Sequence, residues 1–339
     1  MKLFLSRGAR LANRFANNLN KIGINVIASL VKSLYDGLSP QVKKTAKIIL
    51  LPIEGDSGHL YGINNKTGSL VPFIFSRATM GTCYNEDILL VNKESNVPRI
   101  DSLIYSQEIN ILVEKASTNI ISSINLEFIN RTVYDDGYYS GWMLSAHTTL
   151  NRHGVVYPTT TTATTATSAS VLLKYNGVRY VQLRLRSGGE NQWCIIDTQT
   201  GQVTQNIGSL SINVKPVRNG WFKIDLSDIG DPSATAYLII RMSDTETISE
   251  PIKQFSGDGV SGIYYAYPQL EKQNNPTSYI PIEGSAVTRS ADLLSISLSK
   301  ESNVEIQTTE RLIEETKPAG VWNVDQDLNN EGVKYIAIY

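Results

Sequence analysis

The sequence has few of the residues that build disulfide frameworks and metal centres. It has two cysteines, Cys83 and Cys194, and three histidines in 339 residues, with no metal-binding spacing. We interpret both cysteines as buried apolar side chains. No run of about twenty apolar residues occurs, so we expect no membrane span. Arg7, Arg10 and Arg14 interrupt the first apolar positions, so we expect no signal peptide.

Motifs for catalysis are also missing, including dinucleotide and phosphate-binding loops and the HExxH metal motif. Glycosidase chemistry needs only two carboxylates across a cleft, but 32 acidic residues make some such pair inevitable. We therefore predict that the protein is not an enzyme and carries no cofactor or catalytic metal. Asp225, Asp228 and Asp231 could share a structural calcium ion, although capped turns between strands explain them more simply.

Positive charge gathers at the N-terminus. Residues 1–47 hold nine lysines and arginines against Asp36 alone, a net charge of +8, so the remainder carries −9 of the total of −1. Apolar residues recur there at helical spacing, first Leu11, Phe15 and Leu19 and then a second set after Gly23. The pattern predicts two amphipathic helices within residues 1–46.

A basic amphipathic arm suits a membrane surface, a nucleic acid or another protein. The apolar stripe is too full for a segment that only contacts phosphates, and no aromatic platform suits single-stranded nucleic acid. We favour docking on a protein, with a solvated helical hairpin as the simpler alternative. The predicted docking residues are Arg7, Arg10, Leu11, Arg14, Phe15 and Leu19.

From Lys47 the apolar period changes from helical to strand-like. From Ser170 onward, short apolar strands alternate with turns such as Asn176-Gly177 and Asn219-Gly220. Regularly spaced short strands of this kind predict a β-sandwich.

One strand, from Tyr180 to Arg186, alternates cleanly, so Val181, Leu183 and Leu185 should face the core. Its other face would carry an aromatic ring beside amide and guanidinium donors, a combination that suits a sugar. An ordinary solvated sheet face is the simpler alternative. The predicted glycan-binding residues are Tyr180, Gln182, Arg184, Arg186 and Trp193; Trp142 and Trp221 stay open, with Trp221 favoured as core.

The stretch from Tyr264 to Leu294 has a pattern of its own. A tyrosine-rich strand runs into Pro268, which we expect to limit that strand to an edge or a terminus. A polar turn and the irregular segment Tyr279-Ile280-Pro281-Ile282 follow, where both prolines keep their predecessors extended.

These residues resemble the C-terminal edge of jelly-roll modules, similar to carbohydrate-binding modules, in bacteriophage virion proteins. The matching positions are Pro268, Gln269, Leu270, Glu271, Pro276, Thr277, Ser278, Tyr279, Ile280, Pro281, Gly284, Val287, Thr288, Arg289 and Asp292. Further landmarks of the same family match upstream, in the same order: Phe75-Ser76-Arg77-Ala78-Thr79, Asn96-Val97-Pro98-Arg99-Ile100-Asp101, residues 112–119 from Leu112 to Asn119, and Asn219-Gly220-Trp221-Phe222.

The resemblance implies a structural protein of the virion, a head or tail fibre or another appendage, that presents a glycan-binding-like sandwich to the host surface. We expect capsid, portal or tail proteins as partners. The alternatives are a virion-borne glycan depolymerase and a purely structural capsid-decorating protein. The expected parts are a basic docking arm (1–46), a connecting β region (47–120), a jelly roll (121–294) and a small C-terminal β extension (295–339).

The C-terminal extension also suggests self-association. The chain ends on Tyr-Ile-Ala-Ile-Tyr, an apolar strand that an isolated monomer would expose as an unpaired edge unless it joined its own sheet. The resemblance implies oligomers, and several weak sugar sites bind better together. We predict a homo-oligomer, a trimer before a dimer, with the segment after Val321 in the contact.

Overall fold

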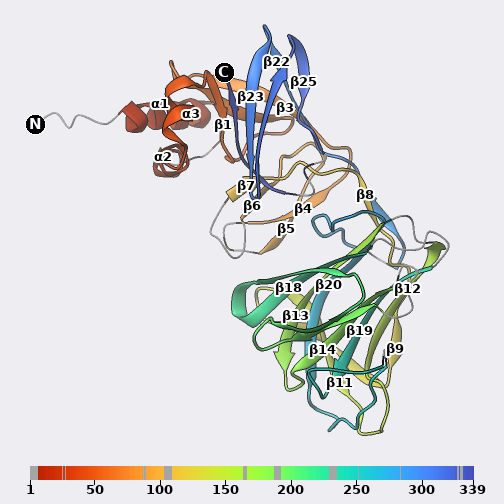
Figure 1. Cartoon of the computed structure of the whole chain (residues 1–339). Helices are drawn as coiled ribbons and strands as arrows, with labels where there is room; N and C mark the ends of the chain where they lie inside the picture. Colours follow the sequence, from red (N-terminus) through yellow and green to blue (C-terminus); the bar gives the residue numbers. More distant parts are fainter. Residues whose placement is uncertain are drawn as a thin grey trace, which may run out of the picture.

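The computed structural model describes residues 7–339 except 25, 27, 86, 88, 103–108, 163–165, 187–191, 229–234, 251, 283, 327, 329 and 330. Figure 1 shows helices at the N-terminus, a sheet beside them and a β-sandwich below. The mainly β architecture, with antiparallel sheets, a sandwich and a short helical N-terminus, confirms the predicted fold class.

The sandwich consists of two six-stranded antiparallel sheets. The first, here called the front sheet, has the order β10-β11-β20-β13-β18-β17, and the second, the back sheet, has the order β16-β15-β14-β19-β12-β9. Their strands are β9 (Asn125–Glu127), β10 (Ile129–Asp135), β11 (Ser140–Ala146), β12 (Gly154–Thr162), β13 (Thr167–Asn176), β14 (Tyr180–Arg186), β15 (Trp193–Asp197), β16 (Val203–Ile207), β17 (Ser211–Pro216), β18 (Trp221–Asp228), β19 (Thr235–Ser243) and β20 (Gly262–Glu271). A short 3-10 turn, η1 (Arg218–Gly220), precedes β18.

Alternating apolar residues of the two sheets form the sandwich core. Val181, Leu183 and Leu185 of β14 are fully buried there, as their alternation predicted. Gly262 shows how closely β11 and β20 approach, because an added Cβ would lie 1.6 Å from the Leu144 carbonyl oxygen. A side chain at that position would force the two strands apart.

A ten-stranded sheet, here called the terminal sheet, takes strands from both ends of the chain. Its path is β24-β23-β26-β1-β2-β3-β22-β25; β7 also pairs with β26, and β6 pairs with β7. These strands are β1 (Ile48–Leu50), β2 (His59–Asn64), β3 (Leu70–Ser76), β6 (Ile100–Ser102), β7 (Ile109–Ile111), β22 (Leu293–Leu298), β23 (Ser302–Thr308), β24 (Leu312–Lys317), β25 (Gly320–Asn323) and β26 (Val333–Ile338). The regions 47–120 and 295–339, which we predicted as separate parts, therefore share one sheet.

Two small ladders lie between the terminal sheet and the sandwich. One pairs β4 (Gly81–Tyr84) with β5 (Leu90–Lys93), and the other pairs β8 (Ser117–Asn119) with β21 (Val287–Arg289). Figure 1 places both ladders at the junction of the two larger parts.

The C-terminal strand β26 lies inside the terminal sheet, between β1 and β23. Ile336 and Ala337 are fully buried. The strand pairs with its own sheet, so our physical reason for a subunit contact, an exposed terminal edge, is wrong. Self-association itself stays a prediction. The two ends of the terminal sheet's path, β24 and β25, both belong to this part of the chain, and Val321 of β25 is 73% exposed.

The basic arm folds as α1 (Arg7–Lys21), α2 (Ala28–Asp36) and a short third helix, α3 (Pro40–Thr45). The third helix begins at Ser39, whose Oγ accepts a hydrogen bond from the Val42 N–H at 3.2 Å. No helix of the described residues is long and apolar enough to cross a membrane.

The apolar face of the arm packs on its own chain. Leu11, Phe15 and Leu19 are buried against the terminal sheet in a cluster that includes Ile49 and Ala337. These three side chains are therefore not free to dock on a partner, which corrects half of the predicted docking surface. Of the other half, Arg10 and Arg14 are exposed, and the side chain of Arg7 lies outside the described residues.

Candidate functional site

Charged residues of the landmark segments, which are far apart in the sequence, meet in one buried network. Arg77 Nη1 lies 3.1 Å from Asp292 Oδ1, and Arg99 Nη2 lies 2.7 Å from Glu114 Oε2 and also contacts Asp292. Arg289 Nη2 completes the network 3.2 Å from Glu114 Oε2. The five side chains are at most 4% exposed, and we call them the ion clamp.

A second set of landmarks fastens the irregular segment after β20 to the clamp. Glu271 accepts hydrogen bonds from Thr277 N at 2.8 Å, Thr277 Oγ1 at 2.6 Å and Gln269 Nε2 at 2.7 Å. Ser278 donates from its backbone N and its Oγ to Glu114, both at 2.8 Å. The residues that carry the resemblance are thus mainly structural, because they join the terminal sheet to the sandwich.

Electrostatics keep Glu114 of the clamp ionised at neutral pH. Burial opposes the charge on Glu114, but Arg99, Arg289 and the Ser278 N–H outweigh it and hold the pKa of Glu114 at about 2. The Glu271 carboxyl has no arginine within ion-pair distance among the described residues, and burial raises its pKa. Glu114 is therefore held by arginine charges, whereas Glu271 is held by neutral donors.

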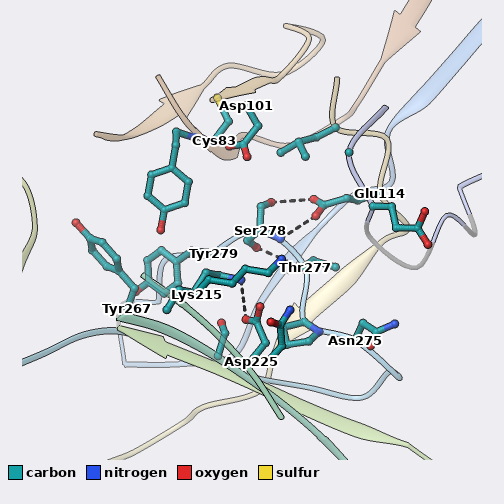
Figure 2. A pocket seen from close by; sticks show the side chains of 18 of the residues that line it. Cys83, Asp101, Glu114, Lys215, Asp225, Tyr267, Asn275, Thr277, Ser278 and Tyr279 are labelled. Carbon is teal, nitrogen blue, oxygen red and sulfur yellow. Dashed lines mark hydrogen bonds and ion pairs between the residues drawn. The ribbon is translucent and has the colours of Figure 1, made fainter. Parts of the chain in front are cut away.

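Beside the clamp lies a cleft of about 500 Å³. It lies between the front sheet and the terminal part, which is our name for the terminal sheet together with the two small ladders. Figure 2 shows Cys83 and Asp101 above it, Lys215 and Asp225 below it, and Tyr267 at one side. The floor belongs to the outer face of the front sheet, because the floor residues Lys223 and Asp225 alternate with Ile224 and Leu226, which face the core. We call this space the composite cleft.

Tyr267 enters the cleft from a distorted point of β20. The pairing of β13 with β20 shifts register between Ser170 and Leu172, and Tyr267 has a φ of 52°. A bulge of this kind turns a side chain out of the regular alternation, and positive φ is costly for a residue with a Cβ. The Tyr267 ring lies 4.9 Å from the ring of Tyr279, which also lines the cleft.

The prediction that Pro268 limits its strand to a sheet edge or ends it is wrong, because β20 continues past Pro268 to Glu271. β20 lies in the interior of the front sheet, between β11 and β13. The bulge at Tyr267 and Pro268 removes the need for a ladder hydrogen bond at the proline, which lacks an N–H.

Charged groups in the cleft are partly paired. Lys223 Nζ lies 2.6 Å from Asp225 Oδ1, and burial lowers the pKa of Lys215. Asp101 Oδ1 accepts the Tyr84 N–H at 2.6 Å, yet burial raises the pKa of Asp101 to about 6. Burial also raises the pKa of Cys83 to about 12, so its thiol is not a nucleophile at neutral pH.

The predicted glycan face of β14 is not an open platform. Gln182 is 1% exposed, Arg184 9% and Trp193 4%, and Tyr180 packs partly buried against a cluster that includes Trp193 and Ile248. The loop around Ile248 is held there, because Ile248 N–H donates to Gln205 Oε1 and its carbonyl accepts from Gln205 Nε2, both at 2.9 Å. The side chain of Arg186 lies outside the described residues.

The remaining candidates also have structural positions. Trp221 is fully buried, as we favoured, and its Nε1–H donates to Asp136 Oδ2 at 2.8 Å. The Trp142 ring carries the Arg131 guanidinium 3.4 Å from its centroid. Asp225 and Asp228 lie on opposite faces of β18 by alternation, so they do not share a calcium ion, and Asp231 lies outside the described residues.

No protein-family model matches the chain, and no curated protein matches its sequence.

Sequence reasoning missed the composite cleft because its walls come from distant segments. The sequence feature that could have indicated the cleft is Pro268, which follows Tyr267 inside a strand. Proline within a sheet marks either an edge or a bulge, and bulges often lie beside binding sites. Asp101, on the opposite wall, was noted only as part of a landmark segment.

Proposed function

We propose that this protein is a structural component of a bacteriophage virion, a head or tail appendage that binds cell-surface glycans in the composite cleft. The observation that carries the glycan part is the Tyr267 ring, held in the cleft by a backbone with φ of 52°. Strained backbone persists where the surrounding structure enforces it, and such positions cluster at binding sites.

The chemistry of the cleft supports a sugar. Tyr267 and Tyr279 offer ring faces, and Ser170 and Asn213 offer a hydroxyl and an amide group beside them. The volume of about 500 Å³ lies within the range of small-molecule sites. Five carboxylates and two lysines line the described walls, which favours a neutral sugar over an acidic one.

Two features support the virion part of the proposal. The landmark segments occur in the same order here as in the resembling modules, and the N-terminal arm is basic. Because Leu11, Phe15 and Leu19 are buried, docking on a capsid, portal or tail protein would use exposed charges such as Arg10 and Arg14. An acidic partner surface fits this charge, and a homo-oligomer, trimer or dimer, would multiply weak glycan sites.

A glycan array followed by calorimetry on the full chain tests the binding. We expect weak binding of neutral glycans by the wild type, a loss of at least about tenfold in Tyr267→Ala, and no change in the matched variant Tyr180→Ala. Equal losses in both variants, or no binding by the wild type, would contradict the proposed site.

A reducing-sugar assay on the same glycans separates the binding protein from a depolymerase. We expect no sugar release. Release at enzymatic rates that disappears in Asp101→Asn or Asp225→Asn would instead establish the depolymerase, because its chemistry needs two carboxylates across the bound sugar.

A further inference from the structure

Asp101 and Asn110 lie side by side in the wall of the composite cleft. They are directly opposite each other in the β6–β7 pair, so both side chains project from the same face of that ladder. Asp101 is 8% exposed and Asn110 is fully buried, and both line the cleft. A carboxylate and an amide are therefore brought together by two strands of the terminal part, outside the sandwich.

The Asn110 side chain makes no hydrogen bond with the part of the chain that the structure describes. Both its Oδ1 and its Nδ2 are buried without a partner among those residues. Gly332 allows the chain to pass closely, since an added Cβ there would lie 2.6 Å from the Asn110 Cβ. Buried polar groups in folded proteins almost always have hydrogen-bond partners. An amide without such partners in a cleft wall therefore indicates that a bound ligand supplies them.

The Asp101 carboxylate complements this amide. Oδ1 already accepts the Tyr84 N–H at 2.6 Å, but an ionised carboxylate has lone pairs for further donors. Asn110 can donate through Nδ2 and accept through Oδ1. Asp101 can therefore accept a hydrogen bond from one sugar hydroxyl group. Asn110 can both donate to and accept from the neighbouring hydroxyl group.

We propose that Asp101 and Asn110 form a specificity subsite that reads two neighbouring hydroxyl groups of a neutral hexopyranose. This inference rests on the proposed glycan binding and names the part of the cleft that selects the sugar. The tyrosines hold any pyranose by its face, whereas the subsite distinguishes epimers by the direction of one hydroxyl group. A site built to hydrogen-bond a hydroxyl group discriminates because its buried polar groups stay unpaired with the wrong ligand.

The test uses the full chain and three probes, the methyl pyranosides of glucose, galactose and mannose, in calorimetric or NMR titrations. We expect the wild type to prefer one of the three. Asn110→Leu replaces the amide with an apolar group of similar size and removes no hydrogen bond from the free protein, so folding stability should be unchanged or higher. Affinity for the preferred probe should fall about tenfold, and the preference between epimers should shrink.

Asp101→Asn is a second test of the subsite, because it keeps the Oδ1 acceptor for the Tyr84 N–H and removes the carboxylate charge. We expect it also to reduce the epimer preference, whereas Tyr267→Ala should weaken all three probes by the same factor. Loss of binding in Tyr267→Ala with wild-type affinity and preference in Asn110→Leu and Asp101→Asn would overturn the subsite alone. Failure of the wild type to bind any probe would overturn both the subsite and the proposed glycan binding.

Discussion

The two outer faces of the sandwich carry similar residues but differ in what covers them. On the back sheet, the loop around Ile248 packs directly on Trp193, and Gln182 and Arg184 are buried. On the front sheet, the terminal part stands away from Lys223 and Asp225 and leaves a cleft of about 500 Å³. Polar alternation therefore identifies an outer face, but only tertiary packing decides whether that face is accessible.

The difference follows from where the covering segment is anchored. Ile248 is bonded to Gln205 on the back sheet itself, so its loop fills the space above. The cover of the front sheet is held from the side, by the ion clamp and by Ser278, which bonds to Glu114. A rigid lateral anchor can keep two surfaces apart, and the cleft is the space that remains between them.

The largest expected effect comes from removing the centre of the clamp. Asp292→Ala would leave Arg77, Arg99 and Arg289 buried around Glu114 alone. Breaking a buried ion pair in this way costs about 3–5 kcal/mol of unfolding free energy. We expect chemical denaturation to show that loss and calorimetry to show that the cleft no longer binds glycan.

Glu127→Ala on the back sheet is the matched control. Glu127 pairs with Arg241 at 2.7 Å and with Arg152 at 3.0 Å, and it is not among the residues that line the cleft. We expect a loss of about 2–3 kcal/mol with glycan binding unchanged. If this variant also abolished binding, general destabilisation and not the clamp would explain the result for Asp292.

The two faces should also respond differently to pH. Asp101 in the cleft wall and Asp197 on the back sheet are both buried, but the pKa of Asp101 is raised and that of Asp197 is lowered. Burial raises the pKa of Asp101 to about 6 from its ordinary 3.8, so its stabilising contribution is complete below about pH 4 and is lost as pH rises through 6. Asp101→Asn, which cannot ionise, should therefore be more stable than the wild type at pH 7, by at most about 3 kcal/mol.

Asp197 on the back sheet should behave in the opposite way. Burial opposes its charge, but Arg179, at 2.8 Å, and the Gln199 N–H lower its pKa below the ordinary value of 3.8. Its contribution is present above that value and is lost as pH falls through the folded pKa. Asp197→Asn should be less stable than the wild type at pH 7, and the two should converge at low pH. Denaturation curves from pH 3 to 8 should give differences of opposite sign for the two variants.

Local patterns predicted the strands well because the alternation of Val181, Leu183 and Leu185 records which face is buried. They also predicted the first two helices of the arm, but not the short third helix that begins at Pro40. Contacts between distant segments were beyond such patterns: nothing near Phe15 shows that the terminal sheet covers it, and nothing near Arg99 shows that Asp292 lies beside it. The resemblance found the clamp residues as a set, but the cleft needed the fold, because Asn110 and Tyr267 meet only there.

The smallest expected effect tests the bulge that directs Tyr267 into the cleft. In ordinary strand backbone glycine is less stable than alanine by roughly 0.5–1 kcal/mol, because it loses more conformational freedom on folding. Tyr180 has no positive φ, so Tyr180→Gly should be less stable than Tyr180→Ala. At Tyr267, with φ of 52°, the order should reverse, because an alanine Cβ is strained by about 1 kcal/mol in that conformation and glycine is not. Both pairs remove the same ring, so denaturant midpoints within each pair compare backbone alone, and an alanine advantage at both positions would show that Tyr267 does not adopt the left-handed conformation.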